Sequence, residues 1–262
     1  MIESKADASA RTAATGSRPE GAVTEQQAAE RVREMFSSIA PRYDFLNHFL
    51  SLNLDRLWRR RVARRFAPLL ARPDSRAIDL CCGTGDLTIE LLRVSRGTVF
   101  GSDFSRPMLQ RAELKTVAAR PRLTGALGGY IEADALKLPF ADASFDLVTN
   151  AFGFRNLANY EKGLHEMARI LRPGGAIAIL EFSQPRSGAF AGLYRLYFTA
   201  ILPRVGRAIS GSTFAYSYLP DSVSKFPPSR TLLQCITNAG LTDANCELWS
   251  GGTVALYTAK KS

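Results

Sequence analysis

A glycine-rich turn and three aspartates form the strongest chemical signal in the sequence. The turn spans residues 81–85, reads Cys-Cys-Gly-Thr-Gly and precedes a helical pattern over 86–94. Asp79 stands just before the turn, and Asp103 and Asp134 each follow a later apolar segment. Glycines let a ligand lie against the backbone at the carboxyl edge of a parallel sheet. The spacing therefore predicts a nucleoside site, in which Asp103 accepts hydrogen bonds from ribose hydroxyls and Asp134 accepts one from an adenine amino group.

The charges around this turn decide between two kinds of ligand. A dinucleotide needs a third glycine near the helix start, where its pyrophosphate lies, but Thr88 occupies that position. Asp86 adds a negative charge that would repel phosphate. S-adenosylmethionine has no phosphate and carries a positive sulfonium and ammonium. Acidic neighbours such as Asp79 and Asp86 therefore favour S-adenosylmethionine over NAD. The alternative is a turn shaped only for packing, which would not require aspartates after three strands.

The surrounding pattern alternates strands and helices, and these elements must position the aspartates. Apolar runs predict strands, and a period of about 3.6 residues predicts helices. The predicted strands are 77–80, 98–102, 129–132, 145–150 and 176–182, with a terminal hairpin over 245–249 and 253–258. The predicted helices are 86–94, one opened by Ser105, 160–171 and 229–239. The predicted fold class is therefore α/β, a doubly wound, mostly parallel, seven-stranded, Rossmann-like sheet.

Helical segments precede and interrupt this core. Thr24 and Gln27 fit a capping box ahead of an amphipathic helix, which Pro41 interrupts. A second helix is expected from about Tyr43 to Phe66. We expect a flexible tail over 1–22 and a single domain over 23–262. Within that domain, 23–72 forms an N-terminal helical cap and 185–228 a substrate-covering helical insertion after the fifth strand.

Further motifs, in a fixed order along the chain, narrow the assignment. Tyr-Asp-Phe-Leu-Asn begins at residue 43 and is followed by Leu50-Ser51 and Trp58-Arg59. The later motifs are Phe-Gly-Phe-Arg-Asn over 152–156, Arg-Ile-Leu-Arg-Pro-Gly-Gly over 169–175, Glu-Phe-Ser over 181–183, and Tyr218-Leu219 with Ser222. Together with the glycine turn, they resemble the UbiE/MenG family of class I S-adenosylmethionine-dependent quinone C-methyltransferases. The resemblance runs from about Val32 to the C-terminus.

The resemblance places Thr84 in the turn against the cofactor, Asp103 on the ribose, and Asp134 with Ala135 near the adenine. The full set of predicted cofactor-binding residues is Asp79, Gly83, Thr84, Gly85, Asp103, Asp134, Ala135 and Asn150.

Three positions depart from the family pattern. Asp55 stands where the family usually has His, which puts a catalytic role there in doubt. Asn53 stands where Gly is common. Ala151 stands where Ser is frequent, so one side-chain contact to the cofactor is missing.

The reaction that the resemblance implies is methylation of a ring carbon on a reduced polyprenyl quinone. Loss of a phenolic proton raises electron density at the ortho carbon, which attacks the sulfonium methyl in line. The protein must align carbon and methyl and give access to a base, which no residue clearly supplies. The candidate catalytic residues are Asn150, Arg155 and Tyr43, and the candidate substrate-binding residues are Tyr216, Tyr218 and Arg155. Packing is the alternative role of each tyrosine, and pairing with a structural acid is that of Arg155.

Composition excludes several other classes of protein. The chain has 262 residues, of which 46% are hydrophobic and 22% charged, as in globular proteins with an ample core. Four cysteines without a C-x-x-C pair, and only two histidines, predict no metal site. We see no signal-peptide pattern and no run of 18 apolar residues, so we expect a cytoplasmic protein without a transmembrane helix.

Arginine dominates the basic excess. The formal net charge is +10, 27 of the 34 basic residues are Arg, and six of these lie within Arg56–Arg65. This cluster predicts contact with anionic lipid at the inner face of the cell membrane, where a surface Arg contributes about 1 kcal/mol. A solvated helix face is the alternative. The aromatic insertion predicts an apolar groove for a prenyl chain, with core packing as the alternative. Its expected lining is Phe190, Leu193, Tyr194, Leu196, Tyr197, Phe198, Ile201 and Leu202.

Several alternatives stay open from the sequence alone. The favoured substrate is demethylmenaquinol, because Phe226-Pro227 and the segment 249–252 resemble the enzymes that act on it. A ubiquinone precursor is the second candidate. Another small-molecule methyltransferase would share the same cofactor site. The charge also allows an RNA-binding protein or RNA methyltransferase. No N/D-P-P-Y/F motif is present, so we expect no nucleic-acid partner. Assembly into a homo-oligomer is a further open prediction.

Overall fold

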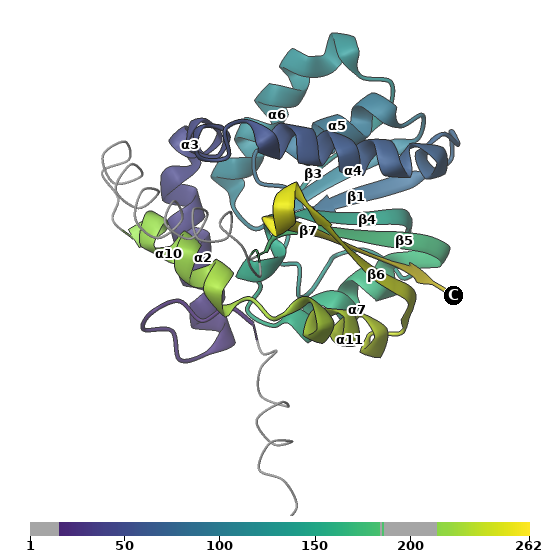
Figure 1. The fold of residues 1–262 in the computed structure, drawn as a ribbon. Coiled ribbons are helices and arrows are strands. Elements are labelled where there is room, and N and C mark those ends of the chain that lie inside the picture. The colour runs from purple at the N-terminus through teal and green to yellow at the C-terminus, as the bar shows by residue number, and fades with distance from the viewer. Residues whose placement is uncertain (1–15, 184, 186–213) are drawn as a thin grey trace, which may run out of the picture.

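Seven strands form one continuous sheet (Figure 1). The computed structural model describes residues 16–183, 185 and 214–262. The strands are β1 Arg76–Leu80, β2 Thr98–Asp103, β3 Ala126–Glu132, β4 Phe145–Ala151, β5 Leu171–Phe182, β6 Leu241–Trp249 and β7 Val254–Lys261. Their order is β3-β2-β1-β4-β5-β7-β6, in which β7 runs antiparallel to β5 and β6 and every other neighbouring pair is parallel. The predicted doubly wound, mostly parallel sheet is confirmed.

Helices cover both faces of the sheet. They are α2 Glu25–Ile39, α3 Tyr43–Leu50, α4 Leu54–Leu70, α5 Asp86–Val94, α6 Arg106–Ala119, α7 Tyr160–Ile170, α10 Phe214–Lys225 and α11 Ser229–Asn238. Helices α4 and α5 lie on one face, and α7 and α11 lie on the other (Figure 1). Helices α2, α3 and α10 gather at one end of the sheet, where α2 contacts both α6 and α10 (Figure 1).

The alternation of side chains along the central strands builds two separate cores. Ile78 of β1 packs in the core that contains Leu164 of α7 and Leu232 of α11. Its neighbour Ala77 faces the opposite side, where Leu91 of α5 belongs to the core. Both faces are covered, so the strands are apolar at nearly every position. The carboxyl ends of β1, β2 and β4 consequently remain the place where polar side chains can gather.

The helix expected from Tyr43 to Phe66 is in fact two helices, and that prediction is wrong. Leu52 and Asn53 have φ angles of 52° and 61°, in the left-handed region that ends a right-handed helix. Asparagine tolerates this region better than most residues, because its short polar side chain can bond locally. The break turns α3 back against the glycine-rich turn, while α4 continues along the sheet to Leu70 and accommodates Pro68.

Other boundaries differ by smaller amounts. Strand β5 begins at Leu171 rather than Ala176, because Leu171 pairs with Phe145 before a bulge. Strand β6 begins at Leu241 instead of residue 245, through pairing with Lys261. The helix over 86–94 and the terminal hairpin are confirmed.

Part of the segment predicted as a flexible tail, over 1–22, packs against the domain. Ser17 is buried, its Oγ lies 2.8 Å from the Tyr218 hydroxyl, and its N–H donates to Leu157 O. The capping box of Thr24 and Gln27 is confirmed. The eight apolar residues expected to line a prenyl groove lie outside the described residues. Among the described residues, every helix is too short or too polar to span a lipid bilayer.

Candidate functional site

The glycine-rich turn leaves the end of β1 and enters α5 with its backbone in the left-handed region. Gly83 and Gly85 have φ angles of 56° and 81°. A Cβ on Gly85 would lie 2.6 Å from the Tyr130 hydroxyl and 3.0 Å from the Ala112 Cβ, so only glycine fits there. The turn therefore packs closely against α6 and Tyr130 of β3, while Gly83 lines the pocket on the other side.

Asp103, at the end of β2, fastens this turn. Its carboxylate accepts one hydrogen bond from the Gly83 N–H at 2.9 Å and another from the Ser105 N–H at 2.9 Å. The side chain is 6% exposed and lines a pocket. Burial raises the pKa of Asp103 to about 6, although the backbone N–H groups lower it. Lone pairs that these two bonds leave free can accept from ligand hydroxyls.

A pocket lies between the carboxyl edge of the sheet and α2, with about 660 Å³ of space that includes open solvent at its mouth. The described residues that line it are Ala29, Phe36, Tyr43, Cys81, Gly83, Asp103, Phe104, Met108, Ala133, Asp134, Ala135, Leu136, Phe152, Gly153, Asn156, Leu157 and Ala158. The charged members of this set are both acidic, Asp103 and Asp134. A cationic ligand with an aromatic group fits such a lining, whereas a pyrophosphate would find no cation there.

The structure brings five predicted cofactor or catalytic residues together at this pocket. Tyr43, Gly83, Asp103, Asp134 and Ala135 all line it. Asp134 is exposed at the rim, and its carboxylate accepts a hydrogen bond from the Leu136 N–H at 2.9 Å.

Asp79 lies beneath the turn and is not among the pocket-lining residues. Its carboxylate accepts hydrogen bonds from the hydroxyls of Thr88, at 2.8 Å, and Thr149, at 2.9 Å. Burial raises the pKa of Asp79 to about 7. Thr88 stands where a dinucleotide fold would place its third glycine, and here it ties α5 to β1. The geometry gives Asp79 the task of shaping the turn.

Asn150 and Arg155 are also bonded within the protein. The Asn150 amide donates to Leu80 O at 2.9 Å and accepts from the Gly153 N–H at 3.2 Å. Arg155 is buried and forms an ion pair of 2.7 Å with Glu181. Both residues hold the loop after β4, which brings Phe152 and Gly153 to the pocket. The alternative of a structural ion pair for Arg155 agrees with this geometry.

The three candidate tyrosines occupy different environments. Tyr43 lines the pocket beside Phe36, with ring centroids 5.9 Å apart, and burial raises its pKa. Tyr218 is buried against Val32 and Met35, and its hydroxyl donates to Asn156 Oδ1 at 3.0 Å. The side chain of Tyr216 lies outside the described residues.

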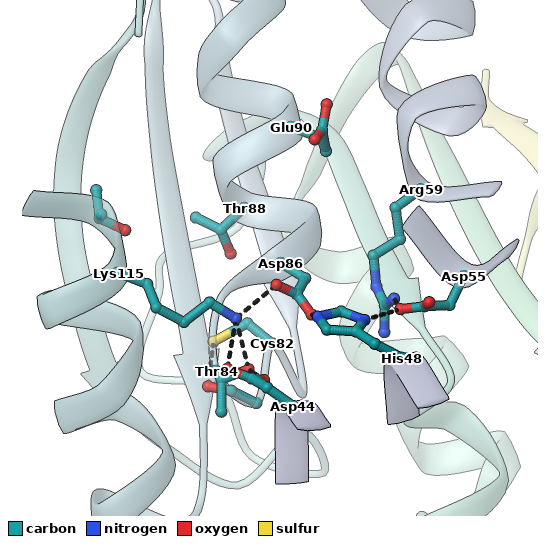
Figure 2. A network of polar contacts seen from close by, with 12 residues as sticks. Asp44, His48, Asp55, Arg59, Cys82, Thr84, Asp86, Thr88, Glu90 and Lys115 are labelled. Carbon is teal, nitrogen blue, oxygen red and sulfur yellow. Dashed lines mark hydrogen bonds and ion pairs between the residues drawn. The ribbon is translucent and has the colours of Figure 1, made fainter. Parts of the chain in front are cut away.

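A polar network joins the cap to the turn (Figure 2). His48 Nδ1 lies 2.9 Å from Asp55, whose carboxylate also pairs with the buried Arg59. Asp44, His48 and Asp86 place ligand atoms within 4.8 Å of one another, as in a metal site. The Lys115 ammonium contacts both of these carboxylates, at 2.9 Å from Asp44 and 2.5 Å from Asp86, so it supplies the positive charge.

Several residues of the site have no signature in the sequence. The apolar walls Phe36, Phe104, Met108 and Phe152 resemble any core residues, although Phe104 directly follows the ribose aspartate. Lys115 is one lysine on an ordinary helix, and only the tertiary fold reveals its two acidic partners. His165 lies on the exposed side of α7, away from the pocket.

Comparison with known proteins gives the context for this site. The sequence profile of the ubiE/COQ5 methyltransferase family matches residues 23–261. A demethylmenaquinone methyltransferase from Deinococcus radiodurans is 48% identical over 216 residues, which cover 82% of this chain and 86% of that protein. One from Thermus thermophilus is 45% identical over 228 residues, covering 87% of this chain and all of that protein. A ubiquinone/menaquinone biosynthesis C-methyltransferase UbiE from Geobacter sulfurreducens is 41% identical over 234 residues, which cover 88% of this chain and 89% of that protein.

Solved structures share the fold at low sequence identity. The [4+2]-cyclase SpnF is 16% identical, with a TM-score of 0.63 over 94% of this chain and 98% of that chain. A SAM-dependent methyltransferase from Aquifex aeolicus is also 16% identical, with a TM-score of 0.52 over 74% and 85%. Fold, pocket lining and sequence thus agree. The chain belongs to the ubiE/COQ5 methyltransferase family and is an S-adenosylmethionine-dependent methyltransferase.

Proposed function

We propose that this enzyme methylates a ring carbon of a reduced polyprenyl quinone precursor and converts demethylmenaquinol to menaquinol. The observation that carries the proposal is a pocket whose charged lining residues, in the described part of the chain, are the two aspartates Asp103 and Asp134. Such a lining suits a cationic cofactor, and the apolar walls suit a quinol ring. Relatives of 45–48% identity named demethylmenaquinone methyltransferase support this substrate.

The cofactor-binding roles belong to this proposal. Asp103 accepts the ribose hydroxyls while its bonds to Gly83 and Ser105 keep the turn in place. Asp134 and Ala135 receive the adenine at the rim. When bound, S-adenosylmethionine supplies an electrophilic methyl group on its sulfonium, and the quinol ring carbon exchanges its proton for that methyl.

The quinol lies against the apolar walls of the same pocket. Phe36, Phe104 and Phe152 exclude water and hold the ring close to the methyl position. Tyr43 lines the pocket, and its phenol is protonated at neutral pH like that of any tyrosine whose pKa is not lowered, so it can donate a hydrogen bond to a quinol oxygen. Arg155 and Asn150 act indirectly, by holding the loop that carries Phe152.

A methyl-transfer assay tests the substrate. Purified enzyme, S-adenosylmethionine and a chemically reduced demethylated naphthoquinone with a short prenyl chain should give the methylated product, detected by mass spectrometry. Asp103→Asn should slow the reaction. The matched control is Asp142→Asn, whose side chain is 78% exposed, and it should match the wild type. Turnover of a benzoquinol instead would favour the ubiquinone branch. Turnover of neither quinol, with methyl transfer to RNA, would refute the proposal.

The proposal includes the domain organisation that the sequence predicts. Residues 23–72 act as a cap whose helices α2 and α3 contribute Phe36 and Tyr43 to the pocket. Residues 185–228 cover the substrate. The cytoplasmic location and a homo-oligomeric state stay predictions.

Membrane contact through the start of α4 is the second part of the proposal. The six arginines of 56–65 are not equivalent, because Arg59 is buried and paired with Asp55, while Arg65 lies 2.5 Å from Glu247. Exposed leucines lie beside the exposed arginines, since Leu52 and Leu57 are 75% and 58% exposed and flank the exposed Arg56. Leucines beside arginines suit the boundary between acyl chains and anionic head groups.

Vesicle co-sedimentation tests this surface. The double variant Leu52→Ser/Leu57→Ser should bind phosphatidylglycerol vesicles roughly tenfold more weakly, because it no longer buries two leucines in the interface. The matched control is Leu114→Ser/Val117→Ser on α6, where the side chains are 71% and 69% exposed. The first variant should also raise the KM for a long-chain quinol and leave a short-chain quinol unaffected. Equal vesicle binding by both variants would exclude this surface.

A further inference from the structure

Lys115 joins three segments that are far apart in the chain (Figure 2). From α6, its ammonium donates to Asp44 Oδ2 at 2.9 Å, Asp86 Oδ1 at 2.5 Å and Thr84 Oγ1 at 3.1 Å. Asp44 belongs to α3 and Thr84 to the glycine-rich turn. Asp86 is the first residue of α5. The Thr84 hydroxyl in turn donates to Asp44. Cap, turn and sheet helices therefore meet at one ammonium group.

The charges show why a cation is needed at this place. Asp44 and Asp86 bring carboxylate oxygens close together, and like charges at such a distance repel. Lys115 makes the only ion pair of Asp44 in the described part of the chain. His48 Nε2 is farther from Asp86, at 3.8 Å, and its other ring nitrogen faces Asp55. Arg59 also lowers the pKa of Asp86, but among the described residues Lys115 is the cation that pairs with Asp44 and Asp86 together. Without Lys115, repulsion between these two carboxylates would weaken the contact between cap and turn.

The same contact controls what covers the cofactor pocket. Asp44 directly follows Tyr43, and the Tyr43 ring lies 3.7 Å from the place that a Cβ on Gly83 would occupy. Fixing Asp44 therefore holds the Tyr43 ring over the turn. Lys115 itself is not among the pocket-lining residues.

We propose that Lys115 is a positioning residue that closes the N-terminal cap over the cofactor site by bridging Asp44 and Asp86. The proposal rests on the assignment of the turn as the cofactor site, and it is independent of the quinol. The ion pairs are partly exposed, at 28% for Lys115 and 27% for Asp44, so solvent weakens them.

Binding of S-adenosylhomocysteine tests the proposal without any quinol. Lys115→Gln should weaken its affinity roughly tenfold in isothermal titration calorimetry and raise the KM for S-adenosylmethionine, with little change in kcat at saturation. Lys115→Arg should keep most of the affinity. The matched control is Lys260→Gln, which removes a surface ion pair of 3.3 Å with Asp243 and should bind like the wild type. Unchanged affinity in Lys115→Gln would overturn the proposal.

A second substitution separates bridging from direct contact with the cofactor. Asp44→Asn alone should weaken affinity roughly threefold, since it keeps the pair between Lys115 and Asp86. Adding Asp44→Asn to Lys115→Gln should recover affinity to that same level, because one repelling carboxylate is gone. Absence of recovery would indicate direct contact between Lys115 and the cofactor and would refute the bridging role. If Lys115→Gln does not fold, an unchanged affinity in Asp44→Asn alone would still refute it.

Discussion

A single buried carboxylate can serve the fold and the ligand together, as Asp103 illustrates. Two backbone N–H groups bond to it, so the residue shapes the glycine-rich turn even before a cofactor arrives. Replacement by Ala would therefore disturb the turn as well as remove a ribose acceptor. Replacement by Asn keeps one acceptor oxygen and loses one of the two backbone bonds, so it disturbs the turn less than Ala does.

We expect Asp103→Asn to weaken S-adenosylhomocysteine binding by about ten- to a hundredfold, the size of a lost hydrogen bond to a charged group. The wild type should also lose affinity as the pH falls through about 6, where the Asp103 carboxylate takes up a proton and stops accepting at that oxygen. Calorimetric titrations between pH 5 and 8 would measure both effects. The variant should lack this pH dependence, and a parallel slope in both proteins would contradict the assignment.

The same pKa has the opposite consequence for the unliganded fold. Burial raises the pKa of Asp103, so the folded chain holds its proton more tightly than the unfolded chain does. Its contribution to stability is full below the ordinary aspartate pKa and is lost as the pH rises through about 6. The ionised Asp103 carboxylate thus lowers the stability of the unliganded protein, and the same ionised form accepts the ribose hydroxyls when the cofactor binds.

Asp55 is the second residue with a testable role. Its carboxylate is 3% exposed and bonds with His48, Ser51 and Arg59. Burial alone would raise the pKa of Asp55, but Arg59, Ser51 and His48 bring it below its ordinary value. A carboxylate fits this position because the buried Arg59 needs a counter-charge. The departure from the family's His therefore has a structural explanation in this chain.

Asp55→Ala should lower the free energy of unfolding by about 3–5 kcal/mol, because Arg59 would stay buried without its partner. Urea unfolding followed by circular dichroism would measure the change. The comparison is Asp221→Ala, which removes an exposed partner of Lys225 and should cost less than about 1 kcal/mol. A similar cost at both positions would contradict a buried counter-charge role.

Among the elements, the break between α3 and α4 decides how the cap sits. Asn53 adopts the left-handed conformation, with φ of 61°. Glycine adopts the same conformation without penalty, which explains why Gly is common at this position in the family that the sequence resembles. The residue type at position 53 is therefore set by the left-handed backbone conformation and not by a catalytic or binding role.

Asn53→Gly should change the free energy of unfolding by less than about 0.5 kcal/mol, whereas Asn53→Val should cost about 1–2 kcal/mol, since a β-branched residue clashes in the left-handed region. Thermal unfolding of the two variants would show the difference. Equal melting temperatures would mean that the break does not require this conformation.

The elements also show how far the sequence can lead. The turn, the strand ends and the aspartates were predictable, because strand, glycine turn and helix follow one another within about 20 residues. The break at Asn53 was not, since a helical period continues across it. Lys115 was not either, because its partners Asp44 and Asp86 lie 71 and 29 residues away. Predicted site residues that proved internally bonded, such as Asn150, look identical in sequence to residues that face a ligand.

Across the whole molecule, positive charge lies on the surface and negative charge lines the pocket. The net charge is +10, yet the pocket carries acidic side chains. Buried arginines are matched within the protein, as Arg59 is by Asp55 and Arg155 by Glu181. The excess is therefore presented outwards by exposed arginines, and the surface and the pocket can attract ligands of opposite charge at once.

The C-terminal strand β7, which is synthesised last, completes the sheet. Strand β7 lies between β5 and β6, and α4 holds the hairpin through the Trp58 indole on Ser250 Oγ at 2.8 Å and Arg61 over the Trp249 ring. A chain ending at Thr253 should fail to fold and should aggregate, whereas removal of Ser262 alone should leave soluble yield and melting temperature unchanged. A soluble, cooperatively melting chain that ends at Thr253 would contradict this.

During synthesis, the helix that carries Trp58 emerges from the ribosome about 190 residues before its partner. Helix α4 can pack against α5 early, but Trp58 and the free edge of β5 lack their C-terminal partners until the end of translation. Nascent chains stalled after β5 should accordingly stay sensitive to protease and retain chaperones, and full protection should appear only after the C-terminus leaves the exit tunnel.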